Sequence, residues 1–398
     1  MTPGDNRKSL QVFRSALASQ GALTRREPGE NIVAVRSKLR GRKGPDGGGM
    51  NDSGGLNDSG GMNDTGDLKD SGEMNDAEPA LVSLAEIREA ARLLAPVAVR
   101  TPLIPVPGMA PGLLVKPESL QPTGSFKLRG AYTAIKANEA AARQHGVVAH
   151  SSGNHGHAVA YAAALLGVHA VVVVPSTAPR VKTSAIESYG AELVTVAPTL
   201  QARLAATEEL VTRHGYVLIP PFDDRKVIAG QGTIGLEIAA DCPQADLVIV
   251  PVSGGGLISG IAAAVRALCP AAAVVGVEPE LAADARESFY RGERVAWPPA
   301  DVQRTIADAL RVELLGALPF AHIRELVTDI VTVTEDEMLT AVRRLAGQAR
   351  LVAEPGGAAA VAAWLFRSAE LPTATTPVAV LSGGNIDPKL LAEILAAD

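Results

Sequence analysis

The chain has 398 residues and a formal net charge of −6, with 47% hydrophobic, 20% charged and 3% aromatic residues. This length fits two or three ordinary domains, or one large enzyme with a subdomain. An acidic chain with few aromatic residues lacks the basic surface and the stacking platforms that nucleic-acid binding requires. The two cysteines, Cys242 and Cys269, have no metal-site spacing and exclude a disulfide framework. They indicate a reducing compartment, and we expect a cytoplasmic protein.

Residues 1–78 are not expected to fold as a domain. A basic stretch is followed from residue 50 by repeats of six residues, of which MNDSGG is the first. Each repeat has one main apolar residue among turn formers and charges, which is too little to bury a core. We predict a disordered, low-complexity tail. A true start at Met50, Met62 or Met74 is an open alternative, and the first 30 residues lack the apolar stretch of a secretory signal.

A stretch without charges, residues 247–265, is long enough to cross a bilayer. Pro251 and the run Gly254–Gly256 interrupt it, whereas a bilayer requires an unbroken helix. We therefore expect a buried strand, a glycine loop and a helix here, and no membrane contact.

Beyond residue 80, short apolar runs alternate with alanine-rich helical stretches. The first helix, after residue 80, has Leu84, Ile87, Ala91 and Leu94 on one face. The expected strands are 146–150, 170–175, 192–196, 247–251, 273–278, 330–333 and 377–382. The expected helices are 156–166, 181–189, 200–214, 233–240, 259–268, 335–350 and 358–365. The alternation predicts an α/β fold with a mostly parallel sheet and helices on both faces, in which ligands bind beyond the carboxyl ends of the strands.

The segment 121–130, QPTGSFKLRG, places a lysine beside a turn. A proline and a glycine favour the turn, and Ser125 is expected to cap the helix that follows. Lys127 would then lie in the first helical turn, where the positive end of the helix dipole lowers the pKa of an amine. A lysine activated in this way suits Schiff-base chemistry. An exposed surface lysine is the alternative.

A second polar segment, HSSGNHGH at 150–157, follows an expected strand and opens an expected helix. Its serines, glycine and asparagine would place hydroxyls, an amide and free backbone N–H groups at a helix N-terminus. Such a site suits a carboxylate or a phosphate, with a plain helix cap as the alternative. The spacing of its three histidines does not favour a zinc site.

Two glycine-rich segments each follow an apolar strand. In the first, Ser253–Gly256, consecutive glycines let backbone N–H groups close on a phosphate. No Gly-Lys-Ser/Thr follows it, so nucleotide hydrolysis is disfavoured. In the second, LSGGN at 381–385, the Ser382 hydroxyl ends a strand and is suited to bond a ring nitrogen. Each segment alone is a weak signal.

Two acidic residues flank a turn in GVEPELAAD at 276–284. Glu278 and Asp284, together with free carbonyls such as that of Ala282, offer oxygen ligands. Oxygen-only sites suit Mg²⁺ or Ca²⁺. Two solvated acids without a ligand are the alternative.

Taken in order, these segments resemble those of the fold-type II pyridoxal-phosphate enzymes, above all serine/threonine dehydratases and serine racemase. The similarity extends over about residues 82–396 and includes SFKLRGA, SSGNHG, VPVSGGGL, GVEP, EPGGAAA and LSGGN. It implies a large domain with a twisted, mostly parallel sheet over 79–145 and 224–398. A smaller α/β domain over 146–223 would be inserted into it, with the cofactor between the two. The resemblance also implies a homodimer.

The resemblance implies roles for individual residues. Lys127 would bind pyridoxal phosphate covalently, and Ser152 would act from the opposite face of its ring. The other cofactor-binding residues would be Phe126, Asn154, Ser253, Gly254, Gly255, Gly256 and Ser382. The substrate carboxylate would be bound by Ser151, Ser152, Gly153 and His155. A divalent cation, Mg²⁺ or Ca²⁺, would be held by Glu278, Asp284 and the carbonyl of Ala282.

The activity that the resemblance implies is a carbon–nitrogen lyase reaction, which converts L-threonine or L-serine to a keto acid and ammonia by β-elimination. Serine racemization and dehydration of threo-3-hydroxyaspartate are alternatives, and a non-catalytic pyridoxal-phosphate protein is an alternative outside enzymes. Three positions depart from the family pattern: His157 replaces the usual Gln, Ser253 replaces a frequent Gly, and Ala309 replaces the usual Gly. The change at Ala309 bears on the shape of the substrate pocket, because glycine admits close approach.

Overall fold

The computed structural model describes residues 79–397, and of Val181 it describes the backbone alone. The predicted tail over residues 1–78 lies outside the described residues. Within them, no helix is long and apolar enough to cross a membrane.

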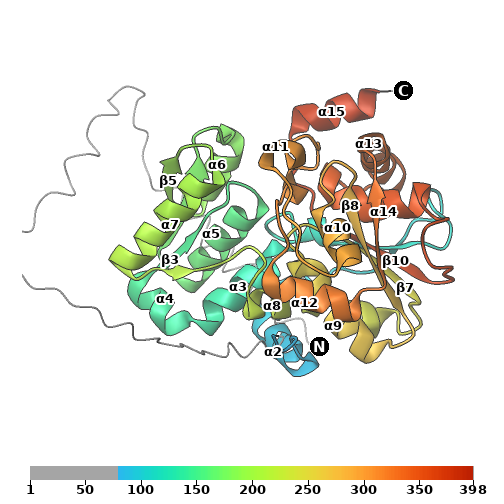
Figure 1. The fold of residues 1–398 in the computed structure, drawn as a ribbon, viewed down its shortest axis with the longest axis horizontal. Helices are drawn as coiled ribbons and strands as arrows, with labels where there is room; N and C mark the ends of the chain where they lie inside the picture. The colour runs from blue at the N-terminus through green and yellow to red at the C-terminus, as the bar shows by residue number, and fades with distance from the viewer. Residues whose placement is uncertain (1–78, 398) are drawn as a thin grey trace, which may run out of the picture. The chain divides into compact units, whose positions relative to one another are not determined.

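In the part of the chain that the structure describes, ten strands form two sheets (Figure 1). The strands are β1 Ile104–Pro105, β2 Leu114–Pro117, β3 Val147–Ala149, β4 Ala170–Pro175, β5 Glu192–Val196, β6 Val217–Leu218, β7 Leu247–Pro251, β8 Ala273–Pro279, β9 Asp329–Val333 and β10 Pro377–Leu381. The six-stranded sheet has the order β1-β2-β10-β7-β8-β9, and the four-stranded sheet has the order β5-β4-β3-β6. All pairs are parallel except β1 with β2, so the predicted mostly parallel α/β fold is confirmed.

Helices separate most of the strands along the chain. The α-helices are α2 Leu84–Leu94, α3 Lys127–Ala137, α4 Glu139–His145, α5 Asn154–Leu166, α6 Arg180–Ser188, α7 Leu200–His214, α8 Arg225–Asp241, α9 Gly256–Leu268, α10 Asp284–Arg291, α11 Pro299–Val302, α12 Ala317–Leu326, α13 Glu335–Arg344, α14 Pro355–Phe366 and α15 Pro388–Ala396. Residues 79–397 also contain two 3-10 turns and one π-helical turn. These are η2 Glu118–Leu120, η3 Asp308–Leu310 and η4 Leu345–Ala349.

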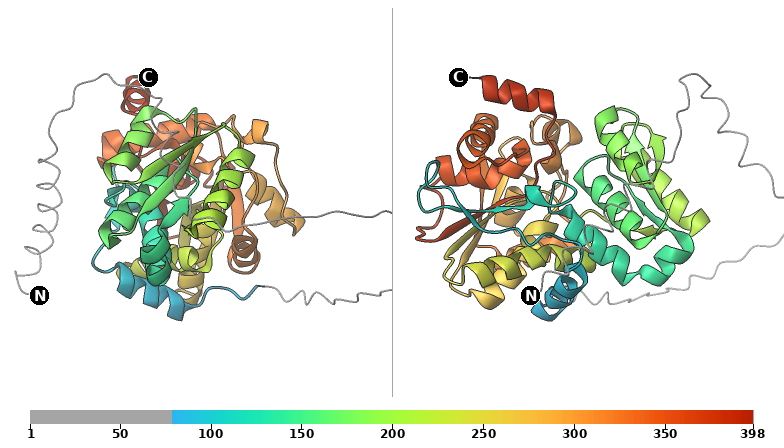
Figure 2. Two further views of the ribbon diagram at one scale, coloured as in Figure 1. Left: turned by 90° about the vertical axis from the view of Figure 1, so that its left-hand side faces the viewer. Right: turned by 180° about the vertical axis from the view of Figure 1, so that it is seen from behind.

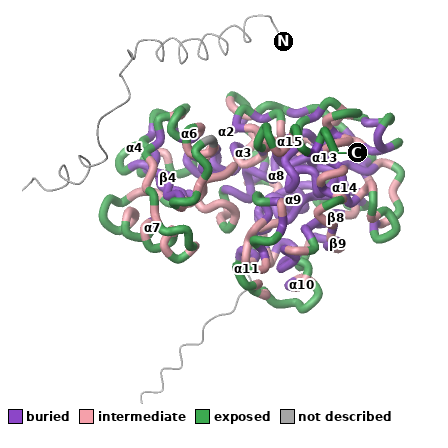
Figure 3. Tube along the Cα trace, turned by 90° about the horizontal axis from the view of Figure 1, so that it is seen from above, coloured by how far each residue is buried: buried purple, intermediate pink, exposed green. Residues whose placement is uncertain are grey.

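Both faces of the six-stranded sheet are covered, as the continuous apolar strands predicted. Leu247 and Ile249 of β7 pack with the residues of α13 and α14, whereas Val248 and Val250 pack with those of α8 and α9. This alternation follows from the two-residue period of a strand. Figure 3 shows α8, α9 and α14 buried over much of their length, while the outer helix α7 is largely exposed.

The four-stranded sheet is built in the same way. Val172 and Val174 of β4 pack with α3 and α5, and Val171 and Val173 pack with the residues of α7. Seen from behind in Figure 2, this sheet and its helices lie beside the six-stranded sheet. The polar segment 150–157 leaves β3 on the way to α5.

The predicted elements differ from the structure at three short strands, at helix bounds and at the helices α4, α10, α11, α12 and α15, which were not predicted. The strands β1, β2 and β6 were not predicted, because two to four residues carry too little pattern. The helix α8 begins at Arg225 rather than near Thr233, since Asp224 caps it by accepting hydrogen bonds from two backbone amides. On α2, Ile87 and Leu94 of the predicted apolar face are buried, but the third buried residue is Ala90 rather than Ala91.

Candidate active site

Three neighbouring strands of the six-stranded sheet direct their C-terminal connections to one region. The strands β2, β10 and β7 are adjacent and parallel, and they lead to the segments that contain Lys127, Ser382 and Ser253. The Phe126 amide donates a hydrogen bond of 3.1 Å to the Ser382 carbonyl, which ties the first two segments together. Strand order thus gathers residues from three distant stretches of the chain, as expected for the carboxyl edge of a parallel sheet.

Lys127 is the first residue of α3, and its amine is enclosed by the protein. Lys127 Nζ donates to the Pro221 carbonyl over 2.7 Å and lies 5.0 Å from the centre of the Phe126 ring. No carboxylate of the described residues pairs with it, and burial lowers the pKa of the amine to about 8. The predicted direction of the pKa shift is confirmed, but its cause is desolvation rather than the helix dipole. A buried amine without a counter-charge loses its proton readily, as a nucleophilic lysine must.

The prediction that Ser125 caps the helix with Lys127 is wrong. The N-cap of α3 is Phe126, which makes no side-chain capping bond. Ser125 instead forms an isolated β-bridge with Gly383, and its buried hydroxyl has no hydrogen-bond partner among residues 79–397. Because the Ser125 backbone pairs with Gly383, the Ser125 hydroxyl does not bond the first amides of α3.

The polar segment 150–157 forms a tight entry to α5. The Ser151 hydroxyl accepts from the Gly153 amide over 3.2 Å, and a Cβ added at Gly156 would lie 2.0 Å from the Ser151 carbonyl oxygen. His155 Nε2 bonds the Ile219 carbonyl over 2.8 Å, so this nitrogen donates. Burial, and then the charge of Lys127, lower the pKa of His155 to about 3. His155 is therefore a neutral imidazole close to Lys127.

Asn154, the first residue of α5, is held by two side chains from beyond the four-stranded sheet. Its Nδ2 donates to Glu354 Oε1 over 2.6 Å, and its Oδ1 accepts from Asn385 Nδ2 over 2.7 Å. Burial, and then the negative charge of Asp308, raise the pKa of Glu354 to about 7. These bonds bring the predicted residue Asn154 against the segment of Ser382.

The glycine loop Ser253–Gly256 connects β7 to α9. Gly255 has φ +88°, a left-handed conformation that favours glycine. Gly254 is covered by Phe222, since a Cβ added at Gly254 would lie 2.2 Å from Phe222 Cδ1. Phe222 directly follows Pro221, the hydrogen-bond partner of Lys127, so the loop and the lysine share one neighbourhood. The first amides of a 13-residue helix suit a phosphate.

The two carboxyls predicted to hold a cation are buried at the end of β8 and the start of α10. Glu278 accepts from the backbone amides of Ala285 and Arg286 over 3.2 and 2.7 Å, whereas Asp284 Oδ2 has no partner in the described part of the chain. Burial and the charge of Asp284 raise the pKa of Glu278, and burial raises the pKa of Asp284 to about 7. Between residues 79 and 397, no three His, Cys, Asp or Glu side chains cluster as a metal site.

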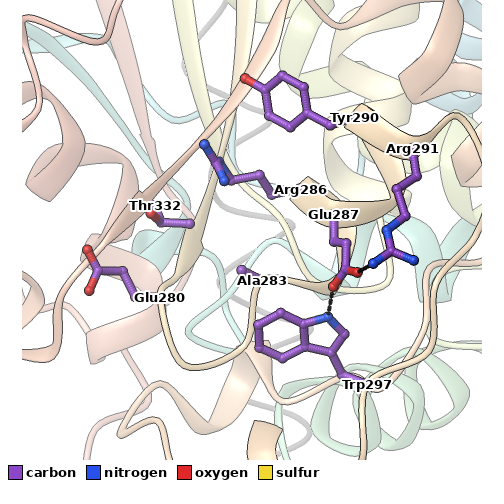
Figure 4. Close-up of a pocket in the computed structure, with 8 residues that line it drawn as sticks. All are labelled: Glu280, Ala283, Arg286, Glu287, Tyr290, Arg291, Trp297 and Thr332. Atoms are coloured by element: carbon purple, nitrogen blue, oxygen red, sulfur yellow. Dashed lines mark hydrogen bonds and ion pairs between the residues drawn. The ribbon is translucent and has the colours of Figure 1, made fainter.

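A separate surface hollow of about 780 Å³ lies along α10 (Figure 4). Its lining includes Glu287, which accepts from Trp297 Nε1 over 2.6 Å and pairs with Arg291, and Arg286, which lies 5.0 Å from the ring centre of Tyr290. None of the predicted catalytic or cofactor-binding residues lines this hollow. Glu287 pairs with Arg291, Glu280 pairs with Arg367 and Arg286 bonds the Ile330 carbonyl, so these charged groups already have partners and the Lys127 region remains the candidate active site.

Sequence reasoning missed four residues of this region. They are Pro221 and Phe222, which follow a two-residue strand, and Glu354 and Asn385. The signal for Glu354 was an acid directly before Pro-Gly-Gly at the start of a wholly apolar helix. Asn385 is the last residue of the motif LSGGN, but nothing in that motif indicates that its side chain bonds Asn154.

Known proteins resemble this chain over most of the described region. Residues 94–383 match the family described as "Pyridoxal-phosphate dependent enzyme". The L-threo-3-hydroxyaspartate ammonia-lyase of Saccharomyces cerevisiae is 40% identical over 71% of this chain and 85% of its own length. The catabolic L-threonine dehydratase of Escherichia coli K12 is 41% identical over the same shares. The structure of maize serine racemase, 34% identical, superposes with a TM-score of 0.75 over 79% of this chain and 97% of that one. The chain therefore belongs to the pyridoxal-phosphate dependent enzymes, of the fold type that its motifs resemble.

Proposed function

We propose that the chain is a pyridoxal-phosphate dependent ammonia-lyase that converts L-threonine or L-serine to 2-oxobutanoate or pyruvate and ammonia. The observation that carries the proposal is the amine of Lys127, which is buried, bonded to one backbone carbonyl and unpaired with any carboxylate of residues 79–397. Relatives named as threonine dehydratase and as hydroxyaspartate ammonia-lyase, each about 40% identical, support this class of reaction.

The residues present fit pyridoxal phosphate. Lys127 would carry the group covalently, and Phe126 would lie beside its ring, as it lies beside the amine. The loop Ser253–Gly256 offers free amides to a phosphate at the start of α9. Asn154 keeps one N–H without a partner in the described region, and Ser382 presents an uncharged hydroxyl next to the Lys127 segment.

Bound pyridoxal phosphate supplies an electron sink for the bond-breaking steps at the substrate Cα. Lys127 removes the Cα proton, because desolvation keeps its amine close to deprotonation at neutral pH. Ser382 would offer the ring nitrogen a neutral partner, which would favour rapid loss of the β-hydroxyl. Ser152 lies at the α5 entry and would hold a proton on the opposite side, which would add a racemase activity.

The substrate carboxylate would bind where α5 begins. Ser151, Ser152 and Gly153 provide hydroxyls and amides at this helix N-terminus. His155 stays neutral and donates to the Ile219 carbonyl, so it shapes the site without repelling Lys127.

We further propose that residues 146–223 form a small domain that closes on the large domain of 79–145 and 224–398 and excludes water. The bond from Asn154 to Glu354 and the ion pair of Lys182 with Asp308 both join these two regions.

A homodimer in the cytoplasm is part of the same proposal. The buried thiols of Cys242 and Cys269 form no disulfide, which fits a reducing compartment.

A divalent cation at Glu278, Asp284 and the Ala282 carbonyl is also proposed. Two adjacent buried carboxyls, one with an oxygen that lacks a partner, are arranged for a counter-ion. Removal of Mg²⁺ and Ca²⁺ with a chelator should then lower the unfolding temperature of the wild type, and Asp284→Asn should lose this response. An unchanged unfolding temperature in the wild type would exclude the cation.

One observation favours threo-3-hydroxyaspartate as a second substrate. Arg203 of α7 is half-buried, and its Nε is enclosed without a hydrogen-bond partner in the described chain. Burial lowers the pKa of His150, which directly precedes the substrate-carboxylate segment, and the positive charge of Arg203 lowers it further. The carboxylate of Glu313 acts on the charge of Arg203, but the enclosed Nε keeps an unused donor in the described chain, which suits a second carboxylate on the substrate.

The test is product analysis with the purified holoenzyme on L-threonine, L-serine and threo-3-hydroxyaspartate, with keto acid and D-amino acid measured in the same samples. Keto acid from threonine or serine with little D-isomer is expected. Dominant D-serine would establish a racemase instead, and bound cofactor without product from any substrate would indicate a non-catalytic protein.

The role of Arg203 is tested by Arg203→Gln on the same three substrates. We expect kcat/KM for hydroxyaspartate to fall about 10- to 100-fold, the effect of a lost charge-assisted bond, while threonine turnover stays within about twofold. Equal losses on all three substrates would assign Arg203 to the fold rather than to substrate selection.

A further inference from the structure

We infer that Glu354 is a positioning residue that fixes the side-chain amide of Asn154, so that one N–H of this amide is left to bind the cofactor. The inference rests on the proposed function only where it assigns that N–H to pyridoxal phosphate. The arrangement of the three side chains Asn385, Asn154 and Glu354 stands on the structure itself.

With Glu354 ionized, the amide of Asn154 has one favourable orientation, because Asn385 Nδ2 also donates to the Thr123 carbonyl over 2.9 Å and is thereby fixed as a donor. Its oxygen accepts from Asn385 Nδ2 over 2.7 Å, and one of its N–H groups donates to Glu354 Oε1 over 2.6 Å. A flipped amide would set donor against donor at Asn385 and acceptor against acceptor at Glu354. The second N–H has no partner in the part of the chain that the structure describes, so it is free for a ligand.

Glu354 is itself held firmly. It directly precedes Pro355 at the start of α14, is 4% exposed, and its backbone amide donates to the Gly383 carbonyl over 3.1 Å. A Cβ added at Gly383 would lie 2.2 Å from Glu354 Oε1, so the carboxyl packs directly on the loop after Ser382. The same carboxyl therefore touches the segment of the proposed ring-nitrogen partner and the amide of Asn154.

Charged groups around Glu354 set its protonation near neutrality. Burial and then the charge of Asp308 raise its pKa, whereas the bond from Asn154 and the charge of Lys182 lower it, and together they place the pKa at about 7. Asp308 and Lys182 form an ion pair with each other, and the Lys182 carbonyl is bonded by His157 Nε2 over 3.0 Å. The ionized carboxylate is the stronger acceptor, so the hold on Asn154 strengthens as pH rises through neutrality.

The experiment compares the wild type with Glu354→Ala and Glu354→Gln by two readouts that need no substrate. These are the visible absorbance band of bound pyridoxal phosphate across pH, and the affinity of the apoenzyme for pyridoxal phosphate. We expect Glu354→Ala to shift the band and to weaken affinity about tenfold, since Asn154 loses an anchoring bond. Glu354→Gln should keep affinity within about threefold, because its amide oxygen still accepts, but should lose the pH dependence of the band near neutrality.

Glu337→Gln is the matched control. Like Glu354, Glu337 lies at the start of a helix; it is in the first turn of α13, accepts from the Thr334 backbone amide over 2.8 Å and pairs with Arg367, but it lies outside the candidate site. It should leave the band and the affinity unchanged. A role of Glu354 in folding alone would likewise leave the band of any folded variant unchanged.

A folded Glu354→Ala with the wild-type band and affinity would overturn the inference. If that variant does not fold, Asn385→Ala removes the other hold on Asn154 and must shift the band in its place; an unshifted band there would equally overturn it. A wild type that binds pyridoxal phosphate but forms no keto acid would refute the ammonia-lyase proposal and leave this inference standing.

Discussion

Two cationic residues, the partly buried Lys127 and the buried Arg129, lie two residues apart on α3 and have opposite surroundings. Lys127 donates to one carbonyl and has no carboxylate partner among the described residues, and its pKa falls to about 8. Arg129 is 1% exposed and bonds both oxygens of Glu118 and both of Glu237, over 2.7–2.9 Å. Burial works against its charge, but the two carboxylates outweigh burial and raise its pKa.

The difference shows that burial alone does not mark a functional residue. A buried charge with complete partners is locked in one state and joins elements; here Arg129 ties α3 to η2 and α8. A buried charge without partners is costly in the free protein, and that cost would make the amine of Lys127 reactive. The same helix thus carries the ion-paired Arg129 and the proposed reactive residue Lys127.

The comparison is tested first by replacing each cation with an apolar residue of similar length. Lys127→Met should lower keto-acid formation by at least roughly 10³-fold, since the proton-transferring amine is gone. The free energy of unfolding of the apoenzyme should stay unchanged or rise, because a buried unpaired charge is removed. Activity assays and denaturant titration measure both. A Lys127→Met protein that turns over at the wild-type rate would remove Lys127 from the reaction.

Arg129→Met should show the reverse pattern. It leaves Glu118, which is fully buried, without its main counter-charge, and breaking a buried pair in this way costs about 3–5 kcal/mol of stability. Denaturant titration measures the loss, and Arg129→Lys, which keeps the charge but not the fork of hydrogen bonds, should fall between the two. A loss below about 1 kcal/mol would show that the network does not anchor α3.

The two cations also show what a sequence can predict. The motif SFKLRGA led to the prediction that Lys127 is the reactive residue, and the apolar runs correctly predicted the parallel sheet, because both signals are local. The partners of Arg129 come from η2 and α8, and those of Asn154 come from residues 200 and 231 positions away. Side-chain networks of this reach depend on how the elements pack, and no spacing along the chain encodes them. The short strand β2, which leads to Lys127, was missed for the related reason that its four residues form no period.

The same contrast between paired and unpaired buried charges exists for two carboxyl groups. Glu118 and Glu354 are both buried, but the charge of Arg129 overcomes burial and lowers the pKa of Glu118, whereas burial and Asp308 raise that of Glu354 to about 7. A carboxyl with a pKa raised on folding stabilizes the fold below about pH 4.5 and loses that contribution as pH rises to about 7. A rise from 4.5 to about 7 corresponds to at most about 3 kcal/mol.

Glu354→Gln cannot ionize and should escape this loss. Its free energy of unfolding, relative to the wild type, should therefore increase between pH 5 and pH 8, by at most about 3 kcal/mol. Denaturant titrations of both proteins at several pH values give the difference, in which the other titrating groups cancel. A difference that does not change with pH would mean that Glu354 ionizes in the fold as it does in the unfolded chain.

The last comparison is at the glycine loop beside Lys127, where packing rather than charge is compared. Gly254→Ala would set a Cβ 2.2 Å from Phe222 Cδ1, so Phe222 has to move, at a cost of about 1–3 kcal/mol. Gly108→Ala is the matched control, because nothing lies within 4 Å of its Cβ and its φ is not positive, and it should be neutral or slightly stabilizing. Since Phe222 follows the Pro221 carbonyl that holds Lys127, Gly254→Ala should also weaken binding of pyridoxal phosphate about tenfold or more, whereas Gly108→Ala should not. Equal cofactor affinities in the two variants would separate the glycine loop from the lysine and confine the candidate active site to the segments of Lys127, Asn154 and Ser382.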